Sequence, residues 1–415
     1  MQLIRTLLQR TRFASLLLAG LGSTLPARAQ VGQADVRTTI LYEPSKESHL
    51  LVFNPAVDLA VQPVEWLDVH AAYEADIVTG ATEALKSGPV ADITSGATDF
   101  HDTRHHVGGG LGLIRKDTRL SVDYSYGTES DYRSHGLSVG ASTDFFQKNT
   151  EIALSYGRGF DEVCTSAYTP STDPSQRTRL DSSEGCFTGA ANRASRDVDI
   201  DNFQAAWTQA WTPVIATQAV LTASLQHGFL ENPYRGVVIA SAGQEALENH
   251  PDNRARGAVS LRGKYFWRGF QTAFSGGVRL YRDTWDIFGQ TYELEAEKYL
   301  TQGLRVLVHG RYYNQSGALF WSDDYTGGEP VSGPRGQYWT GDREVSPLSS
   351  WMVGGRVLLA TQGAPTNRVL GFLLRFQVTG AFDLLKTNLR EFTWGGDEPT
   401  DDTSLLMSLA VRGEF

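Results

Sequence analysis

The C-terminal segment, residues 402–415, alternates between apolar and polar side chains over most of its length. Leu405 and Met407 fall on one face of an extended chain, whereas Ser404 and Ser408 fall on the other. A period of two is typical of a β-strand that has an oily neighbour on one side and water on the other. This pattern constrains the fold more than any other feature, because it recurs along the whole chain.

Clear further examples of the alternation are spread over the sequence, at residues 120–126, 257–267, 292–297, 304–312 and 370–377. A water-soluble β-sandwich also alternates. However, charged residues at every second position need a solvated surface on the polar face, and the lumen of a barrel provides one.

The connections between these segments alternate in length. Short ones are expected at residues 63–65, 116–117, 147–149, 213–215, 268–269, 301–303 and 363–366. Longer ones are expected near residues 79–103, 128–133, 160–197, 230–253, 317–347 and 382–401, with modest or tight tips at 43–49 and 283–284. Short periplasmic turns and long extracellular loops are typical of outer-membrane barrels. The sequence therefore predicts an all-β, transmembrane, antiparallel up-and-down β-barrel of about sixteen strands, or about fourteen to eighteen if strand ends shift.

The N-terminal residues have the features of a secretory signal peptide. Arg5, Arg10 and Arg12 precede a short apolar run at residues 13–21, and small residues occupy the two positions that a signal peptidase reads before Gln30. The apolar run is shorter than the roughly 20 residues of a membrane-spanning helix. We expect residues 1–29 to be cleaved and residues 30–415 to form the barrel in the outer membrane, with both termini periplasmic.

Composition agrees with a barrel and excludes one class of partner. Hydrophobic residues make up 41% of the chain, and the mean hydropathy is -0.28. This hydrophobic content is enough for a membrane barrel, since only alternate residues of each strand face lipid. The formal net charge is -10 before the arginine-rich signal is removed. Nucleic-acid partners are excluded, because binding phosphates needs basic patches.

Two cysteines, Cys164 and Cys186, lie in one long polar stretch. In an oxidising periplasm they predict a disulfide that closes this loop. A two-cysteine metal site is a poor alternative, since no histidine lies near them. Adjacent His105 and His106 point to opposite faces of a strand, so no metal site and no cofactor are expected. No nucleophile-elbow signature is present, and we expect no enzymatic activity.

The predicted lumen carries charges of both signs. Acidic side chains are expected at Asp68, Glu74, Asp123, Glu293, Glu295 and Glu297. Basic side chains are expected at Arg104, Arg262, Lys264, Arg305, Arg311, Arg356 and Arg375. Facing rows of opposite charge would create a transverse field that orders water and selects solutes. Cross-strand ion pairs that only hold the wall together are an equally strong interpretation.

Several segments resemble a family of uncharacterised bacterial outer-membrane barrels that is catalogued only as a domain of unknown function. The matching segments are residues 79–82, 94–98, 100–106, 121–157, 281–295 and 311–321. The resemblance implies the barrel and its location, and it transfers no substrate and no site residue. The terminal aromatic Phe415 also resembles the signal that outer-membrane barrels present to their assembly machinery.

Three functions remain open at this stage. The first is a porin-like channel for hydrophilic solutes. The second is an export pore for a surface polysaccharide, working with separate periplasmic partners, in which aromatic residues near one mouth contact sugars: Tyr313, Trp321, Tyr325, Tyr338 and Trp339. The third is a plugged structural or surface barrel, with loops 160–197 and 317–347 as candidate plugs. Outer-membrane lipid and the assembly machinery are expected partners, and a homo-oligomer is an open alternative.

Overall fold

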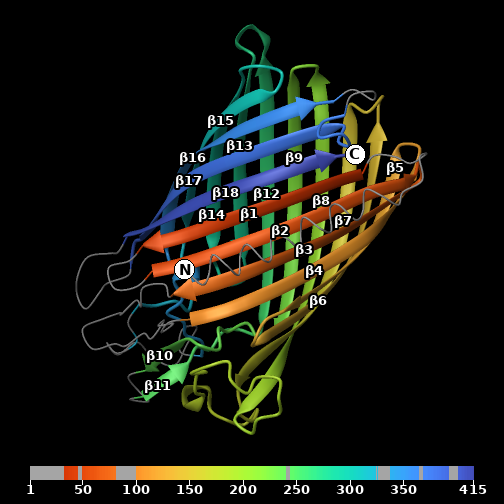
Figure 1. Cartoon of the computed structure of the whole chain (residues 1–415). Coiled ribbons are helices and arrows are strands. Elements are labelled where there is room, and N and C mark those ends of the chain that lie inside the picture. Colours follow the sequence, from red (N-terminus) through yellow and green to blue (C-terminus); the bar gives the residue numbers. More distant parts are fainter. Residues whose placement is uncertain are drawn as a thin grey trace, which may run out of the picture.

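The computed structural model describes residues 32–44, 49–80, 100–239, 244–323, 325, 337–363, 368–391 and 401–415. In these residues sixteen antiparallel strands close into one barrel (Figure 1), with the hydrogen-bonded order β1-β18-β17-β16-β15-β14-β13-β12-β9-β8-β7-β6-β5-β4-β3-β2. The predicted fold class and strand number are therefore confirmed. The predicted signal peptide, residues 1–29, lies outside the described residues.

The barrel strands pair with their neighbours in sequence, except that β9 pairs with β12 and that β1 pairs with β18 to close the barrel. Their bounds are β1 Gly32–Pro44, β2 His49–Val64, β3 Leu67–Gly80, β4 Phe100–Arg115, β5 Thr118–Thr128, β6 Tyr132–Phe145, β7 Thr150–Ser166, β8 Arg193–Thr212, β9 Ile215–Gly228, β12 Asn253–Trp267, β13 Thr272–Asp283, β14 Phe288–Tyr299, β15 Leu304–Gln315, β16 Leu348–Gln362, β17 Arg375–Leu389 and β18 Asp401–Glu414.

The seam between β1 and β18 brings Gly32 and Phe415 together. The backbone N–H of each donates to the carbonyl of the other, over 3.0 and 2.9 Å. The Phe415 ring lies against Gly32, where any side chain would collide with it. A side chain at residue 32 would therefore force the Phe415 ring to move, and both chain ends of the barrel lie at the end that carries the short turns.

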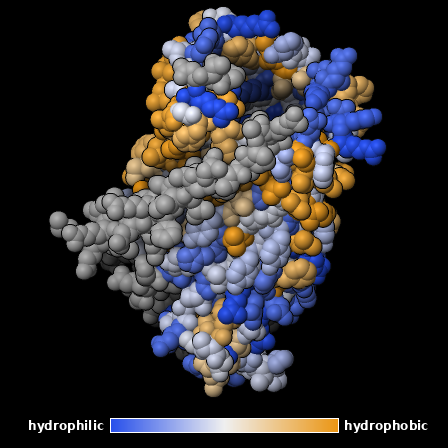
Figure 2. Space-filling model, turned by 45° about the vertical axis from the view of Figure 1, so that its right-hand side comes forward, coloured by the Kyte–Doolittle hydropathy of each residue, from blue (hydrophilic) through white to orange (hydrophobic). Residues whose placement is uncertain are grey.

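Side chains on the two faces of the wall differ as the period-two pattern predicts. Apolar residues on the outer face are open to the surroundings, and Leu294 and Val353 are 73% and 63% exposed. Figure 2 shows hydrophobic residues on the upper outer face, hydrophilic residues inside a hollow at the upper end, and more hydrophilic residues below. An exposed apolar surface of this extent marks contact with an apolar medium.

Helical structure is minor. In the part of the chain that the structure describes it amounts to short 3₁₀ turns at η1 Pro174–Gln176, η2 Arg268–Phe270 and η3 Arg343–Val345. Among these residues we find no helix with the length and apolarity needed to span a bilayer.

The buried apolar clusters lie in the long loops and the strand ends that support them. We use the name loop cluster for residues 167–192, 229–239, 244–252, 284–287, 316–323, 325 and 337–347. It includes a small hairpin of β10 Gly236–Ile239 and β11 Gln244–Leu247 (Figure 1), and its largest apolar group contains Trp285, Ile287, Ala318, Phe320, Trp321 and Val345. Barrel strands alone bury little, so the loop cluster supplies the packed core of this molecule.

Three connections differ from the sequence-based expectation. The loop expected near residues 382–401 is shorter, because β17 continues to Leu389. Residues 364–366 of the turn expected at 363–366 lie outside the described residues. The next strand begins later than expected, because Val369 and Leu373 pair with each other and β17 starts only at Arg375. Leu370, which was expected on a strand, adopts a left-handed conformation with φ 52°. The loop expected at residues 160–197 is shorter, because the β7–β8 ladder continues to Ser166 and Arg193 after the apolar alternation has ended.

Candidate functional site

The inward faces of β12 to β16 form a basic arc of the lumen wall. Register places these side chains on the face opposite to the exposed apolar residues. The basic arc carries Arg254, Arg256, Arg262, Lys264, Arg279, Arg305, Arg311 and Arg356, against the acidic residues Asp283, Glu293, Glu295 and Glu297. Basic side chains therefore outnumber acidic ones on this side of the barrel.

The inward faces of β2 to β5 form an acidic arc. Its carboxylates are Asp58, Asp68, Glu74, Asp76, Asp102 and Asp123, against the two arginines Arg104 and Arg119. In the closed strand order, β12 to β15 lie half-way round the barrel from β2 to β5. The basic and acidic arcs therefore face each other across the lumen, which is the geometry of a transverse field.

A ladder of glutamates on β14 divides the basic arc. Register sets Glu293 directly across from Arg311 on β15. The glutamates make ion pairs on both sides of β14. On β12 the pairs are Arg262–Glu295 at 3.5 Å and Lys264–Glu297 at 3.8 Å, and on β15 they are Arg305–Glu297 at 3.6 Å and Arg311–Glu293 at 3.7 Å. The distances are long and the cationic partners are exposed, so each pair contributes only about 0.2–1 kcal/mol. These side chains are therefore available to a solute as well as to each other.

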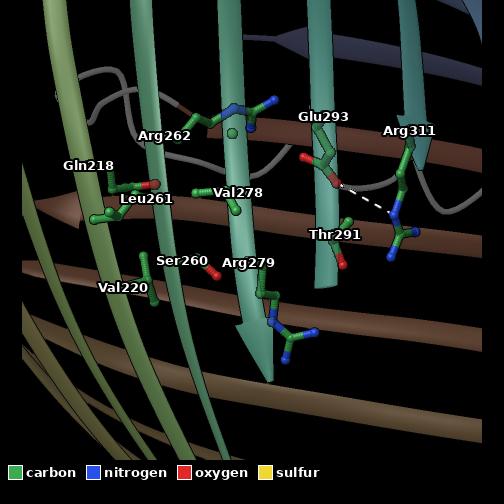
Figure 3. Close-up of a pocket in the computed structure, with 11 residues that line it drawn as sticks. Gln218, Val220, Ser260, Leu261, Arg262, Val278, Arg279, Thr291, Glu293 and Arg311 are labelled. Carbon is green, nitrogen blue, oxygen red and sulfur yellow. Dashed lines mark ion pairs between the residues drawn. The ribbon is translucent and has the colours of Figure 1, made fainter. Parts of the chain in front are cut away.

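A small cavity of about 270 Å³ lies within the basic arc. Figure 3 shows Arg262, Arg279, Glu293 and Arg311 around it, on β12 to β15. Its floor includes Gly277, which is paired with Arg262 on one side and with Glu293 on the other. Because glycine has no side chain, the space between these two residues stays open. In the described residues Arg279 makes no ion pair, and its guanidinium stands 5.9 Å from the centre of the Tyr281 ring. The cavity is therefore lined by three guanidinium groups and one carboxylate.

The remaining sequence-predicted residues lie apart from this cavity. Asp123 lies on the acidic arc, with Oδ1 3.0 Å from Nε2 of His70. Arg375 lies at the short-turn end and pairs with Glu414 at 3.3 Å. The predictions omitted Arg279, although β13 alternates as clearly as its neighbours: Ala273, Ser275 and Gly277 share its face, and Phe274, Val278 and Leu280 occupy the other.

Cys164 and Cys186 form a disulfide that joins β7 to the loop cluster, as the sequence predicts. Both cysteines are buried beside Leu180, which is 1% exposed. The bond closes a loop with a sequence separation of 22 residues. It therefore holds the 167–192 loop against the end of the barrel.

Buried polar groups join the other loops of the loop cluster. Glu248 is 1% exposed and accepts hydrogen bonds from Thr340 Oγ1 at 2.9 Å and from the Gly341 N–H at 3.1 Å. Arg235 makes a close ion pair with Asp342. These contacts connect loop 229–252 with residues 340–342, so the two long loops form one unit.

His250 occupies the centre of this unit. Its ring packs against Trp285 and Phe320, and Nε2 lies 3.5 Å from Glu248 Oε2. Burial alone lowers the pKa of His250, but the neighbouring Glu248 carboxylate outweighs it and the net pKa is raised. His250 and Glu248 therefore form a buried pair at the centre of this unit.

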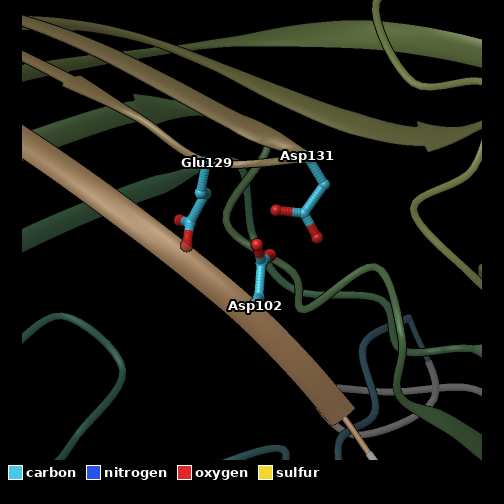
Figure 4. A group of neighbouring side chains, drawn as sticks. All are labelled: Asp102, Glu129 and Asp131. Atoms are coloured by element: carbon cyan, nitrogen blue, oxygen red, sulfur yellow. The ribbon is translucent and has the colours of Figure 1, made fainter. Parts of the chain in front are cut away.

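Three carboxylates that the predictions did not group together meet near the mouth of the acidic arc: Asp102, Glu129 and Asp131 (Figure 4). Burial, followed by repulsion from Asp131 and Asp102, raises the pKa of Glu129 to about 7. Tyr234 of the loop cluster donates a short hydrogen bond to Asp131. The sequence spacing of these residues shows no metal-ligand pattern, and the antiparallel pairing of β4 with β5, which sets His105 across from Thr128, brings Asp102 to the other two.

Aromatic residues that were considered for contact with sugars lie mainly inside the loop cluster. Trp321, Tyr325 and Trp339 are buried, at 6%, 7% and 4% exposure. The Trp339 Nε1–H donates to the carbonyl of Leu247, and Tyr325 donates to the carbonyl of Phe320. These three rings are therefore not available for the sugar contacts considered for an export pore, because they form the core that joins the loops.

A family model described as "Protein of unknown function (DUF3570)" matches residues 14–354. No curated protein matches the chain. The segments that carry the family resemblance all lie inside the matched range.

Solved structures that resemble this chain include three bacterial proteins. A bacterial polysaccharide outer membrane secretin is 9% identical, with 91% of this chain and 98% of that chain covered and a TM-score of 0.45. OpdQ of Pseudomonas aeruginosa is 10% identical, with 93% and 98% covered and a TM-score of 0.42. OccK2 (OpdF) of Pseudomonas aeruginosa, in complex with glucuronate, is 9% identical, with 92% and 98% covered and a TM-score of 0.40. The likeness extends to the barrel fold and no further.

Proposed function

We propose a porin-like channel function for this chain, which belongs to the DUF3570 family of proteins of unknown function. In this proposal the barrel is an integral protein of the bacterial outer membrane, and it lets small hydrophilic solutes cross. The observation that carries the proposal is the pair of facing arcs of opposite charge on the inner wall of a closed sixteen-stranded barrel. A barrel of this size is wide enough for an aqueous channel.

The outer surface supports the membrane location. Exposed apolar residues cover strands on the outside, whereas charged residues occupy the inside, which inverts the usual arrangement of a soluble protein. The orientation follows from loop length, because short turns are typical of the periplasmic side. The termini at the short-turn end are then periplasmic, residues 1–29 are the cleaved signal, and Phe415 is the assembly signal.

Planar-bilayer recording with the protein purified from outer membranes tests the channel function. Steady open steps at low voltage, with selectivity that changes when lumen arginines are replaced, are the expected result. A barrel that inserts into the bilayer and remains silent, with and without the loop cluster, would contradict the proposal.

A second candidate is a pore that the loop cluster keeps closed until a partner opens it, which includes polysaccharide export with periplasmic partners. The packed core and the disulfide of the loop cluster favour a closable mouth. The burial of Trp321 and Trp339 counts against sugar contacts at these two rings. Silence in the intact protein, followed by conductance after removal of residues 167–192, would favour this candidate.

The proposed assembly signal has its own test. Replacing Phe415 with Ser should reduce the amount of folded barrel in the outer membrane while leaving export to the periplasm intact, because the terminal aromatic is lost. The amount of heat-modifiable barrel in the membrane fraction measures the effect. An unchanged amount would count against a signalling role and would leave Phe415 a purely structural residue of the β1–β18 seam.

A further inference from the structure

The small cavity in the basic arc has more positive charge than its own carboxylate can balance. Arg262, Arg279 and Arg311 line it together with Glu293. Arg311 Nε lies 3.7 Å from Glu293, and Arg262 reaches away to Glu295 at 3.5 Å. In the part of the chain that the structure describes, Arg279 has no carboxylate partner. A solute that enters this cavity therefore meets guanidinium groups with unused hydrogen-bond donors.

Guanidinium groups favour one chemical class of ligand. Their planar forks match the two oxygens of a carboxylate, and such charge-assisted pairs are stronger than neutral hydrogen bonds. The arginines here lie on three different strands, β12, β13 and β15, so they approach a ligand from more than one direction. The geometry therefore fits a small organic anion better than a cation or an apolar solute.

Neutral groups make up the rest of the lining, and three of them, Val220, Leu261 and Val278, are apolar. Gln218 contributes an amide, and Ser260 and Thr291 contribute hydroxyls. These groups can donate to and accept from hydroxyl groups of a ligand. Gly277 leaves the floor open, and a Cβ there would make only ordinary contacts, at 3.6 Å from the Leu261 carbonyl oxygen and 3.7 Å from Arg262 Cγ. A volume of about 270 Å³ is enough for a small solute only.

The opposite wall adds to the preference. The carboxylates of the acidic arc, which include Asp58 and Asp102, repel an anion and direct it toward the basic arc. Asp58 is set directly across from Asp35 on β1, whose own charge is balanced by Arg412 at 2.7 Å. An anion in the lumen is therefore held at the cavity wall, whereas a cation is held on the other side.

We propose that the Arg262–Arg279–Arg311 cavity is a binding subsite for a small hydroxylated carboxylate. This inference rests on the proposed channel function, because it names the class of solute that the channel takes. The carboxylate of the solute lies between the guanidinium groups, and its hydroxyl groups lie against Gln218, Ser260 and Thr291. Glu293 keeps Arg311 in place and limits the affinity, so that the solute can leave as well as enter.

The test uses gluconate as the carboxylate probe and sorbitol as the matching neutral polyol. Gluconate binding to the purified full-length protein in detergent is measured by calorimetry, and gluconate block of single-channel current is measured in bilayers. Arg279→Gln should weaken gluconate binding by about tenfold, the loss of roughly one charge-assisted hydrogen bond. Sorbitol should bind at least tenfold more weakly than gluconate to the unaltered protein.

Two variants serve as controls. Arg282→Gln makes the same substitution on β13 but on the outer face, where Arg282 is 75% exposed, and should leave gluconate binding unchanged. Arg356→Gln removes a charge from the basic arc outside the cavity. It should shift ion selectivity as Arg279→Gln does, yet keep gluconate affinity within about twofold.

The outcomes separate the two proposals. Gluconate binding that weakens in Arg279→Gln and not in Arg356→Gln supports the subsite. Equal weakening in both variants, or equal binding of sorbitol, overturns it, because the general field rather than the cavity would then act. Specific binding without any conductance would retain the subsite and reject the open channel, whereas conductance without binding would reject the subsite alone.

Discussion

The lumen wall and the base of the loop cluster hold their charges in different ways. On the wall, the Arg311 and Glu293 side chains remain 43% and 45% exposed, and 3.7 Å separates their paired atoms. At the base of the loop cluster, the Asp283 side chain is fully buried and pairs closely with Arg254. Asp283 also accepts hydrogen bonds from the N–H groups of Trp285 and Ile287, at 3.1 and 2.9 Å.

This difference separates two uses of the same residue types. Exposed, long ion pairs contribute little to stability and leave the charges available to ions and solutes. A buried pair is costly to break, because removing one partner leaves an uncompensated charge without water. The wall is therefore suited to selection of solutes, and the loop-cluster base is suited to holding a mouth in one shape.

The largest effect is expected at the loop-cluster base. Arg254→Met should destabilise the loop cluster by about 3–5 kcal/mol, because Asp283 would remain buried without its cation. Native-state hydrogen exchange of the Trp285 and Ile287 amides, which both donate to Asp283, measures the local opening. Arg311→Met on the exposed wall is the matched control and should change their exchange very little. Similar exchange in the two variants would refute the proposed difference between the regions.

The disulfide gives the next largest effect. A variant with both Cys164→Ser and Cys186→Ser should lose roughly 3 kcal/mol of stability in the 167–192 loop, because the open chain gains conformational entropy. Limited proteolysis of intact barrels measures the loop opening, and the reduced natural protein should be cleaved at the same rate as the variant. If the double variant resists the protease as well as the oxidised natural protein does, the packing of Leu180 and its neighbours holds the loop without the disulfide.

A pH effect is expected at the three-carboxylate group. The pKa of Glu129 is raised to about 7, so the neutral form is favoured in the folded protein. The stabilisation is therefore full below about pH 4.5, and it is lost as the pH rises through about 7. Glu129→Gln stays neutral at every pH, and this variant should be more stable than the natural protein above pH 7.

Urea-unfolding midpoints between pH 5 and pH 8, measured with a chelator present, test this prediction. The natural protein should lose stability over this range, and the Glu129→Gln variant should have a flatter profile. Lys148→Gln, in a short turn at the other end of the barrel, is a control for a change of charge alone. Parallel profiles for the natural protein and Glu129→Gln would show that Glu129 ionises at an ordinary pH.

The comparison between wall and loop cluster also explains which features could be predicted from sequence. The wall is built from local alternation, so the strands, their inward charges and the neighbouring positions of Glu293 and Arg311 follow from reading along the chain. Facing arcs of opposite charge depend on where β12 and β2 lie in the closed order. Which strands face each other across the lumen can be stated only when the number of strands in the barrel is known.

The loop cluster could not be predicted in the same way. Glu248 and Thr340 are 92 positions apart, and no periodic pattern connects them. Trp321 and Trp339 were considered for contact with sugars near one mouth, but packing between loops buries them. The disulfide was the exception, since only two cysteines are present and an oxidising compartment favours their bond.

The smallest expected effect is the coupling between Glu293 and Arg311. A double-mutant cycle with Glu293→Gln and Arg311→Gln should give a coupling free energy of about 0.2–1 kcal/mol, because water reaches both side chains. The same cycle should change ion selectivity more clearly, since each substitution alters the field in the lumen. Urea unfolding measures the coupling, and reversal potentials in a salt gradient measure the selectivity. A coupling well above 1 kcal/mol with unaltered selectivity would make the glutamate ladder a structural device, and the contrast between wall and loop cluster would then rest on burial alone.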